Sequence, residues 1–138
     1  MNWLRSILDG RPIWINASMI FCAYMTFIYL PWDLFVKPVA VDQEVWFGIL
    51  FTGWAAKLAA LPHWAIYAAG TFGFYRMRSW MWPWAAVYTA QVAVGMLVWC
   101  VIEYGGGRGW FSGFAAFVPF AALTRAFWNA RPLFQNRA

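Results

Sequence analysis

Long apolar runs alternate with short polar connections along the whole chain. Each run has at least about 18 residues, and a transmembrane helix needs ~20 predominantly apolar residues to cross the hydrocarbon core. The pattern predicts an all-α, polytopic membrane protein folded as a four-transmembrane-helix bundle. The expected spans are residues 13–30, 45–75, 80–102 and 110–128.

The second run, residues 45–75, is too long for one straight crossing. As a continuous helix it would reach ~46 Å, against a hydrocarbon core of ~30 Å. Pro62 favours a kink, so one interpretation is a single bent helix. The other makes residues 45–54 an interfacial extension. Lys57 then lies near the outer boundary, where its ammonium snorkels to water, although pairing with an acid of the first connection is also open.

Composition assigns the chain to the membrane class. Of its 138 residues, 64% are hydrophobic and 11% are charged, against about a quarter charged in soluble domains. The length suits a single integral membrane domain, residues 1–138, with no second domain. The net charge of +5 comes from bases that flank apolar runs, so we expect no nucleic-acid partner.

The positions of the bases predict an orientation. Seven of the ten lie at the chain ends or in the second connection, which a four-span arrangement places on one side of the membrane. The positive-inside rule then puts both termini in the cytoplasm and residues 31–44 outside, as in a bacterial-type inner membrane. These bases are Arg5, Arg11, Arg76, Arg78, Arg125, Arg131 and Arg137.

Polar residues inside the apolar runs are the candidates for function, since burying them in lipid is expensive. No spacing of a catalytic or metal site links them, so we predict neither a metal nor a cofactor. His63 is interpreted as structural or interfacial in preference to a ligand of haem or a chlorin-type pigment. Gln91, one turn after Tyr88, needs a partner in the bundle, which is either a ligand or another helix.

The chain is rich in tryptophan, with 12 residues, and most lie near predicted span ends, where an interfacial belt explains them. The belt does not explain Trp54, Trp64 and Trp99. These three tryptophans either line an apolar pocket or fill space between helices. The predicted ligand-binding residues are therefore Trp54, Lys57, His63, Trp64, Tyr88, Gln91 and Trp99.

Several features together resemble the EXPERA group of four-span membrane proteins, which includes the emopamil-binding sterol isomerase and the sigma-2 receptor. They are Leu30-Pro31-Trp32-Asp33 at the end of the first run, Trp46-Phe47 and Leu61-Pro62 in the second, and Trp80, Pro83, Gln91, Gly95 and Glu103 in the third. The resemblance implies a bundle that binds a sterol-like or other lipid-like ligand. The acidic residue that those proteins carry in the second span has no equivalent, because Trp54, Ala56 and Lys57 stand there.

We therefore expect a small membrane protein that binds a hydrophobic or lipid-like molecule in an aromatic-lined helix bundle without doing chemistry. One alternative is a sterol-isomerase-like membrane enzyme with Glu103 and Lys57 as acid and base. Another is an accessory subunit of a larger membrane complex. Expected partners are the bilayer, the lipid-like ligand, and a second copy of the chain or a larger complex.

Overall fold

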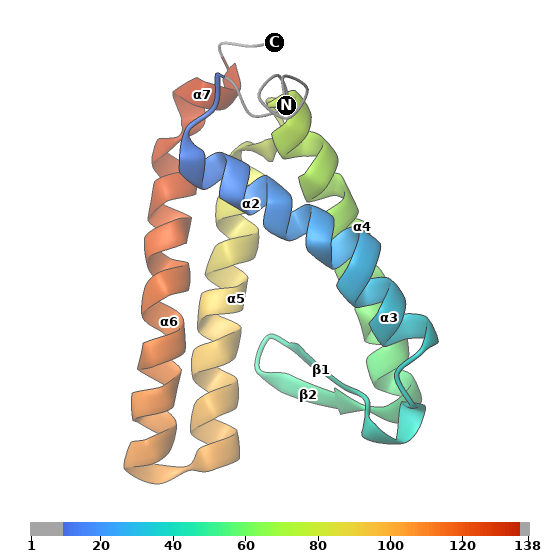
Figure 1. Cartoon of the computed structure of the whole chain (residues 1–138). Helices are drawn as coiled ribbons and strands as arrows, with labels where there is room; N and C mark the ends of the chain where they lie inside the picture. The colour runs from blue at the N-terminus through green and yellow to red at the C-terminus, as the bar shows by residue number, and fades with distance from the viewer. Residues whose placement is uncertain (1–9, 136–138) are drawn as a thin grey trace.

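A computed structural model describes residues 10–135 of the chain, and it is mostly helical (Figure 1). The first helical stretch joins α2 (Ile13–Tyr24), a π-helical segment (Met25–Tyr29) and α3 (Leu30–Phe35). The other helices are α4 (Gly53–Arg76), α5 (Met81–Tyr104), α6 (Gly106–Asn129) and α7 (Arg131–Gln135).

Three of the described helical stretches are long and apolar enough to cross a membrane: Ile13–Phe35, α5 and α6. This supports a membrane-spanning protein. Helix α4 has 24 residues, as many as α5 and α6, but Lys57, His63 and Arg76 make it less apolar. The fourth span therefore stays a prediction.

Pro31 does not end the first helix, contrary to the prediction of a span over residues 13–30. A proline has no N–H and its ring crowds the preceding turn, and the helix accommodates it by widening to π geometry just before it. The Leu30 N–H bonds to the Met25 carbonyl. The Thr26 carbonyl instead accepts a hydrogen bond from the Trp64 indole Nε1 of α4, at 2.8 Å. The helix can therefore continue to Phe35.

A β-hairpin interrupts the second apolar run, so the all-α prediction is wrong at this point and residues 45–75 do not form one bent helix. Strand β1 (Gln43–Trp46) pairs antiparallel with β2 (Ile49–Thr52), with Trp46 opposite Ile49. The turn residues Phe47 and Gly48 both have positive φ, 52° and 85°, as a two-residue hairpin turn with strand-matching twist requires. β-Branched and aromatic residues on both sides favour strand.

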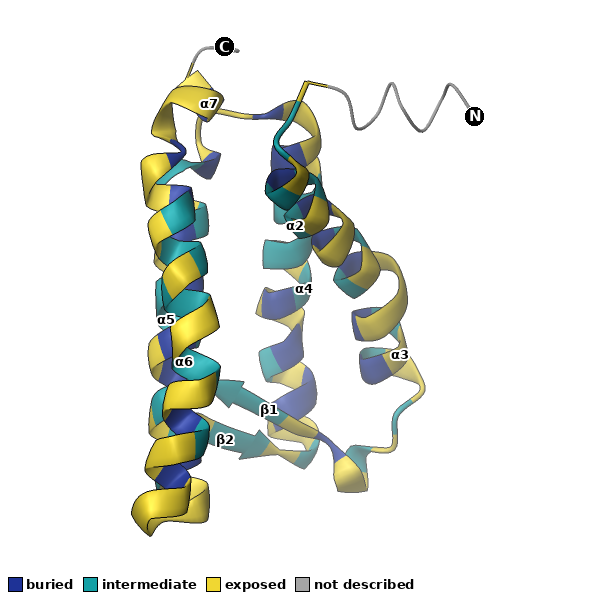
Figure 2. Cartoon of the chain, turned by 60° about the vertical axis from the view of Figure 1, so that its left-hand side comes forward, coloured by how far each residue is buried: buried dark blue, intermediate teal, exposed yellow. Residues whose placement is uncertain are grey.

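The helices form two pairs that converge at one end of the molecule. Figure 1 shows α5 and α6 side by side, α2 and α3 lying along α4, and the hairpin crossing between the pairs at the opposite end. Where the pairs meet, a buried core joins the end of α4, the start of α5, the end of α6 and α7. Its members include Phe74, Met77, Met81, Phe127 and Phe134. Apart from this core, much of the helix surface is exposed (Figure 2).

Small residues bring α6 against α5. A Cβ on Gly109 would lie 2.9 Å from the Cys100 carbonyl oxygen, and one on Gly113 would lie 2.8 Å from Leu97 Cδ1. Two glycines four residues apart let helix backbones approach closely in lipid. Helix α6 begins at Gly106, four residues before the predicted start of this span at residue 110.

Candidate functional site

Lys57 is buried and paired, so the interpretation of a snorkelling lysine is wrong. Its side chain is 8% exposed, and Nζ lies 3.0 Å from Oδ2 of Asp42. The ammonium also donates to the backbone carbonyls of Asp33 and, at 2.9 Å, Lys37. A lysine has three N–H donors, and these three acceptors use them all. The carbonyls belong to the end of α3 and the residues after it, where a cation is favoured by the helix dipole.

Lys37 completes a cluster with two cations and two carboxylates, called here the ionic cluster (Asp33, Lys37, Asp42 and Lys57). Its Nζ lies 2.8 Å from Oδ1 of Asp33 and 2.6 Å from Oδ1 of Asp42. Burial opposes ionisation of Asp42, yet the hydrogen bonds and charges of both lysines hold its pKa below the ordinary value. Burial likewise opposes the charge of Lys37, but the hydrogen bonds to Asp33 and Asp42 raise its pKa. The cluster is neutral and ties α3, the following loop and α4 together.

Glu44 and His63 form a second polar pair. Glu44 lies in β1, two residues after Asp42 of the ionic cluster. Glu44 Oε1 lies 2.7 Å from His63 Nδ1. Trp46, on the same face of β1 as Glu44, stacks on the imidazole with ring centroids 3.9 Å apart and donates from Nε1 to the Ala59 carbonyl. The strand thus supplies both a carboxylate and an aromatic face to His63.

Two tyrosines continue this aromatic region between the helix pairs. The rings of Tyr67 of α4 and Tyr88 of α5 meet edge to face, with their centroids 5.9 Å apart. The His63 ring lies 6.3 Å from that of Tyr88 and 6.4 Å from that of Tyr67. Trp46, His63, Tyr67 and Tyr88 are called here the aromatic cluster.

Two polar atoms on α5 are buried and make no hydrogen bond within the described part of the chain: Gln91 Oε1 and Trp99 Nε1. Gly95 lies between them and faces the hairpin turn, because a Cβ there would be 3.4 Å from the Gly48 nitrogen and 3.6 Å from Gln91 Nε2. A Cβ on Gly48 would in turn be 3.4 Å from the Trp99 nitrogen. An unpaired buried polar atom costs about 1–3 kcal/mol, so a partner here would be stabilising. These two atoms, with the hairpin turn, are called here the α5 polar site.

The other predicted residues do not join these groups. Trp54 is 73% exposed and lines nothing buried, while Trp64 bonds to the Thr26 carbonyl and so helps to hold α4 against the first helix. Glu103 is exposed at the end of α5. Among the described residues, Lys57 contacts Asp33, Lys37 and Asp42 and not Glu103, so the structure does not bring together the candidate acid and base.

Sequence reasoning missed Glu44, Trp46 and Tyr67 as neighbours of His63. A period-two pattern could have placed Glu44 and Trp46 on one strand face, but Glu44 was assigned to the first connection and Trp46 to the run that was expected to be helical or interfacial. Within the described residues, no group of three or more His, Cys, Asp or Glu side chains could hold a metal ion.

Lining up the chain with protein-family models, with curated proteins and with solved structures yields no match. The resemblance to the EXPERA group therefore stays an expectation, and the case for function depends on the geometry of this chain.

Proposed function

We propose that the protein binds a neutral, lipid-like molecule between α4, α5 and the hairpin, and that it does so without chemistry. The observation that carries the proposal is the pair of unpartnered polar atoms on α5. Gln91 Oε1 is an acceptor and Trp99 Nε1 is a donor. The two residues are eight positions apart on α5, or ~12 Å along the helix, so a ligand with two separate polar groups, one a donor and one an acceptor, would satisfy them.

The aromatic cluster supports an apolar, flat body for this ligand. Its rings come from β1, α4 and α5, the elements that surround the α5 polar site. Aromatic faces with a few fixed polar groups are typical of sites for small hydrophobic ligands. Figure 1 shows that α4 and α5 diverge towards the hairpin, which crosses between them.

Charge compensation supports a neutral ligand. The four charges of the ionic cluster satisfy one another, and the Glu44 carboxylate already has a partner in His63. A cationic amphiphile would have to break one of these pairs, at the expense of leaving a buried charge uncompensated. We therefore expect such amphiphiles to bind weakly.

The sterol-isomerase-like alternative receives less support from the site. A general acid or base must reach the reacting atom. The Lys57 ammonium has all its donors engaged by the end of α3 and Asp42, and Glu103 is exposed at the far end of α5.

Native mass spectrometry of the protein extracted from its own membrane tests the proposed function. Retention of a neutral lipid at one copy per chain is the expected result. A stoichiometric second protein with no lipid would instead favour the accessory-subunit alternative. Turnover of an added sterol-like lipid would favour the isomerase.

The proposed topology has four spans with both termini in the cytoplasm. Its support is the alternating direction of the helical stretches (Figure 1) and the arginines at the start of α2 and the end of α4, which are Arg11, Arg76 and Arg78. Single cysteines at the exposed positions Val41 and Arg131 should react with a membrane-impermeant thiol reagent from opposite sides of intact cells. Labelling of both from one side would contradict the topology.

A further inference from the structure

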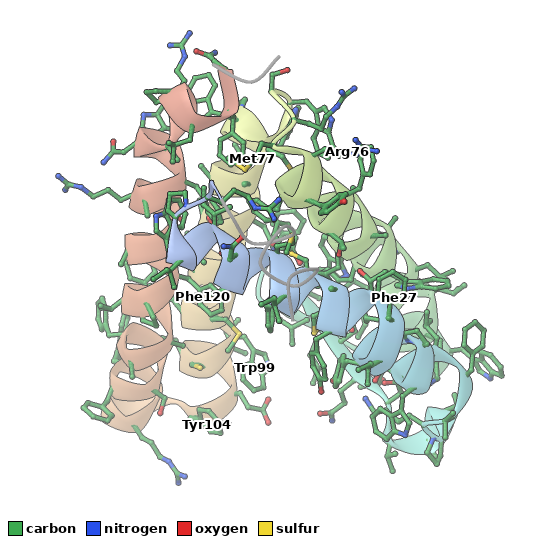
Figure 3. All side chains as sticks on the ribbon, turned by 45° about the horizontal axis from the view of Figure 1, so that its top comes forward. Phe27, Arg76, Met77, Trp99, Tyr104 and Phe120 are labelled. Atoms are coloured by element: carbon green, nitrogen blue, oxygen red, sulfur yellow. The ribbon has the colours of Figure 1, made fainter. Side chains whose placement is uncertain are left out.

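The charges of the described residues separate between the two ends of the molecule. All four described acids lie at the hairpin end, with three of the bases. The other end, where α2 begins and α7 lies, carries five arginines and no described carboxylate (Figures 1 and 3). The acids are Asp33, Asp42, Glu44 and Glu103; the five arginines are Arg11, Arg76, Arg78, Arg125 and Arg131.

Three of these arginines have the guanidinium carbon over an aromatic ring: Arg11 and Arg76 over Tyr75, and Arg131 over Trp82. The Arg131 guanidinium carbon lies 4.6 Å from the centre of the Trp82 ring, and that of Arg76 lies 5.6 Å from the centre of the Tyr75 ring. Stacking of this kind orients the guanidinium plane. It leaves N–H groups at the edge of the plane for an anion. Among the described residues, Arg76 has no hydrogen-bond or ion-pair partner.

The aromatic partners of this end also suit a membrane surface. Trp82 packs against Trp128 at 5.3 Å and donates from Nε1 to the Trp128 carbonyl. Both tryptophans lie at the ends of the apolar helices α5 and α6. Amphipathic indole rings are enriched at the level of lipid headgroups. The stacked arginines are therefore at the depth where lipid phosphates are expected.

We propose that this arginine end, defined by Arg76, Arg78, Arg125 and Arg131, binds the headgroups of anionic phospholipids. A guanidinium fork matches the oxygens of a phosphate, and a phosphate supplies the negative charge that the described side chains at this end lack. This arginine end is separate from the α5 polar site. Its proposed ligand is anionic, whereas the ligand proposed for the α5 polar site is neutral.

Thermal unfolding of the delipidated protein in a neutral detergent, titrated with phosphatidylglycerol or phosphatidylcholine, tests the proposal. We expect phosphatidylglycerol to stabilise the protein at lower concentration than phosphatidylcholine, and we expect added salt to weaken this preference. Each of Arg76→Gln and Arg131→Gln should raise the half-saturating phosphatidylglycerol concentration about five-fold, as for ~1 kcal/mol per arginine near a charged surface. Arg76→Lys keeps the charge and should restore most of the effect.

Arg108 provides a matched control. It stacks on Tyr104 at 5.5 Å, so it has the same kind of contact, but it lies at the hairpin end. Arg108→Gln should leave the phosphatidylglycerol titration unchanged. The proposal is wrong if this variant weakens the response as much as Arg76→Gln does. It is also wrong if both lipids stabilise the protein equally, or if inorganic phosphate at the same concentration stabilises the protein as much as phosphatidylglycerol does.

Discussion

The Lys57 ammonium lies 3.0 Å from the Asp42 carboxylate, with the Asp42 side chain fully buried. The two residues come from different elements, the loop before β1 and the second turn of α4. Removal of one partner from a buried pair leaves the other charge uncompensated, which typically costs ~3–5 kcal/mol. Removal of an exposed, snorkelling lysine would cost less than ~1 kcal/mol of stability.

Lys57→Leu should therefore lower the free energy of unfolding by about 3–5 kcal/mol. The measurement is equilibrium unfolding in mixed micelles, with Arg108→Leu as the control for loss of an exposed base. The double variant Lys57→Leu with Asp42→Asn should lose less stability than the sum of the two single changes, because each single change already breaks the pair between these residues. Asp42 also pairs with Lys37 through its other carboxylate oxygen. A loss for Lys57→Leu no larger than that of the control would restore the snorkelling interpretation.

The ionic cluster also predicts how stability depends on pH. The lowered pKa of Asp42 contributes stability that is present above the ordinary carboxyl value, 3.8, and is lost as pH falls through the folded value. The raised pKa of Lys37 contributes stability that is present below 10.5 and is lost as pH rises through the folded value. Unfolding midpoints should thus be flat between these limits and fall on both sides. Asp42→Asn should reduce both falls, and unchanged acid and alkaline limbs would contradict this assignment.

Trp64 should matter for stability through one hydrogen bond. Trp64→Phe keeps an aromatic ring but removes the N–H that bonds to the Thr26 carbonyl, which Pro31 deprives of a helical donor. The expected loss is about 1–3 kcal/mol, the cost of an unsatisfied buried carbonyl. Trp54→Phe, at a position 73% exposed, is the control and should change stability by less than ~0.5 kcal/mol. Equal losses in the two variants would show that the hydrogen bond contributes nothing.

The contact between the hairpin and α5 should control the proposed lipid site. A methyl group at Gly48 would overlap Val98, and Gly48 has a φ of +85°, which a residue with a Cβ adopts at a penalty. Gly48→Ala should therefore move the turn from α5 and reduce lipid retention. In Gly107→Ala the new methyl group meets nothing within 4 Å, so retention should be unchanged. Full retention of the lipid by Gly48→Ala would show that the hairpin turn does not contribute to lipid binding.

The apolar runs predicted most of the helices, because a membrane helix is specified largely by its own length and hydropathy. The apolar pattern failed at residues 43–52, where strand propensity and Gly48 in the turn produce a hairpin that hydropathy alone does not indicate. The prediction that the first helix ends at Pro31 was wrong. Pro31 is accommodated by the π-helical turn just before it and by the Trp64 donor of α4, and hydropathy indicates neither.

For the site, Gln91, Trp99, His63 and Tyr88 could be selected as polar or aromatic residues inside apolar runs. Their neighbours could not, because Glu44 and Trp46 reach His63 only through the strand. The partners of Lys57 were among the acids that the sequence offered, but the choice between pairing and snorkelling depended on the loop fold.

The most direct test of the proposed lipid site is lipid retention by Gln91→Leu, measured by native mass spectrometry together with the free energy of unfolding. Leucine removes the unpartnered acceptor, so the variant should lose the bound neutral lipid and, once delipidated, be more stable than the parent by about 1–3 kcal/mol. Gln43→Leu, at an exposed position of β1, should retain the lipid. Full retention by Gln91→Leu, or loss of stability without loss of lipid, would contradict the account.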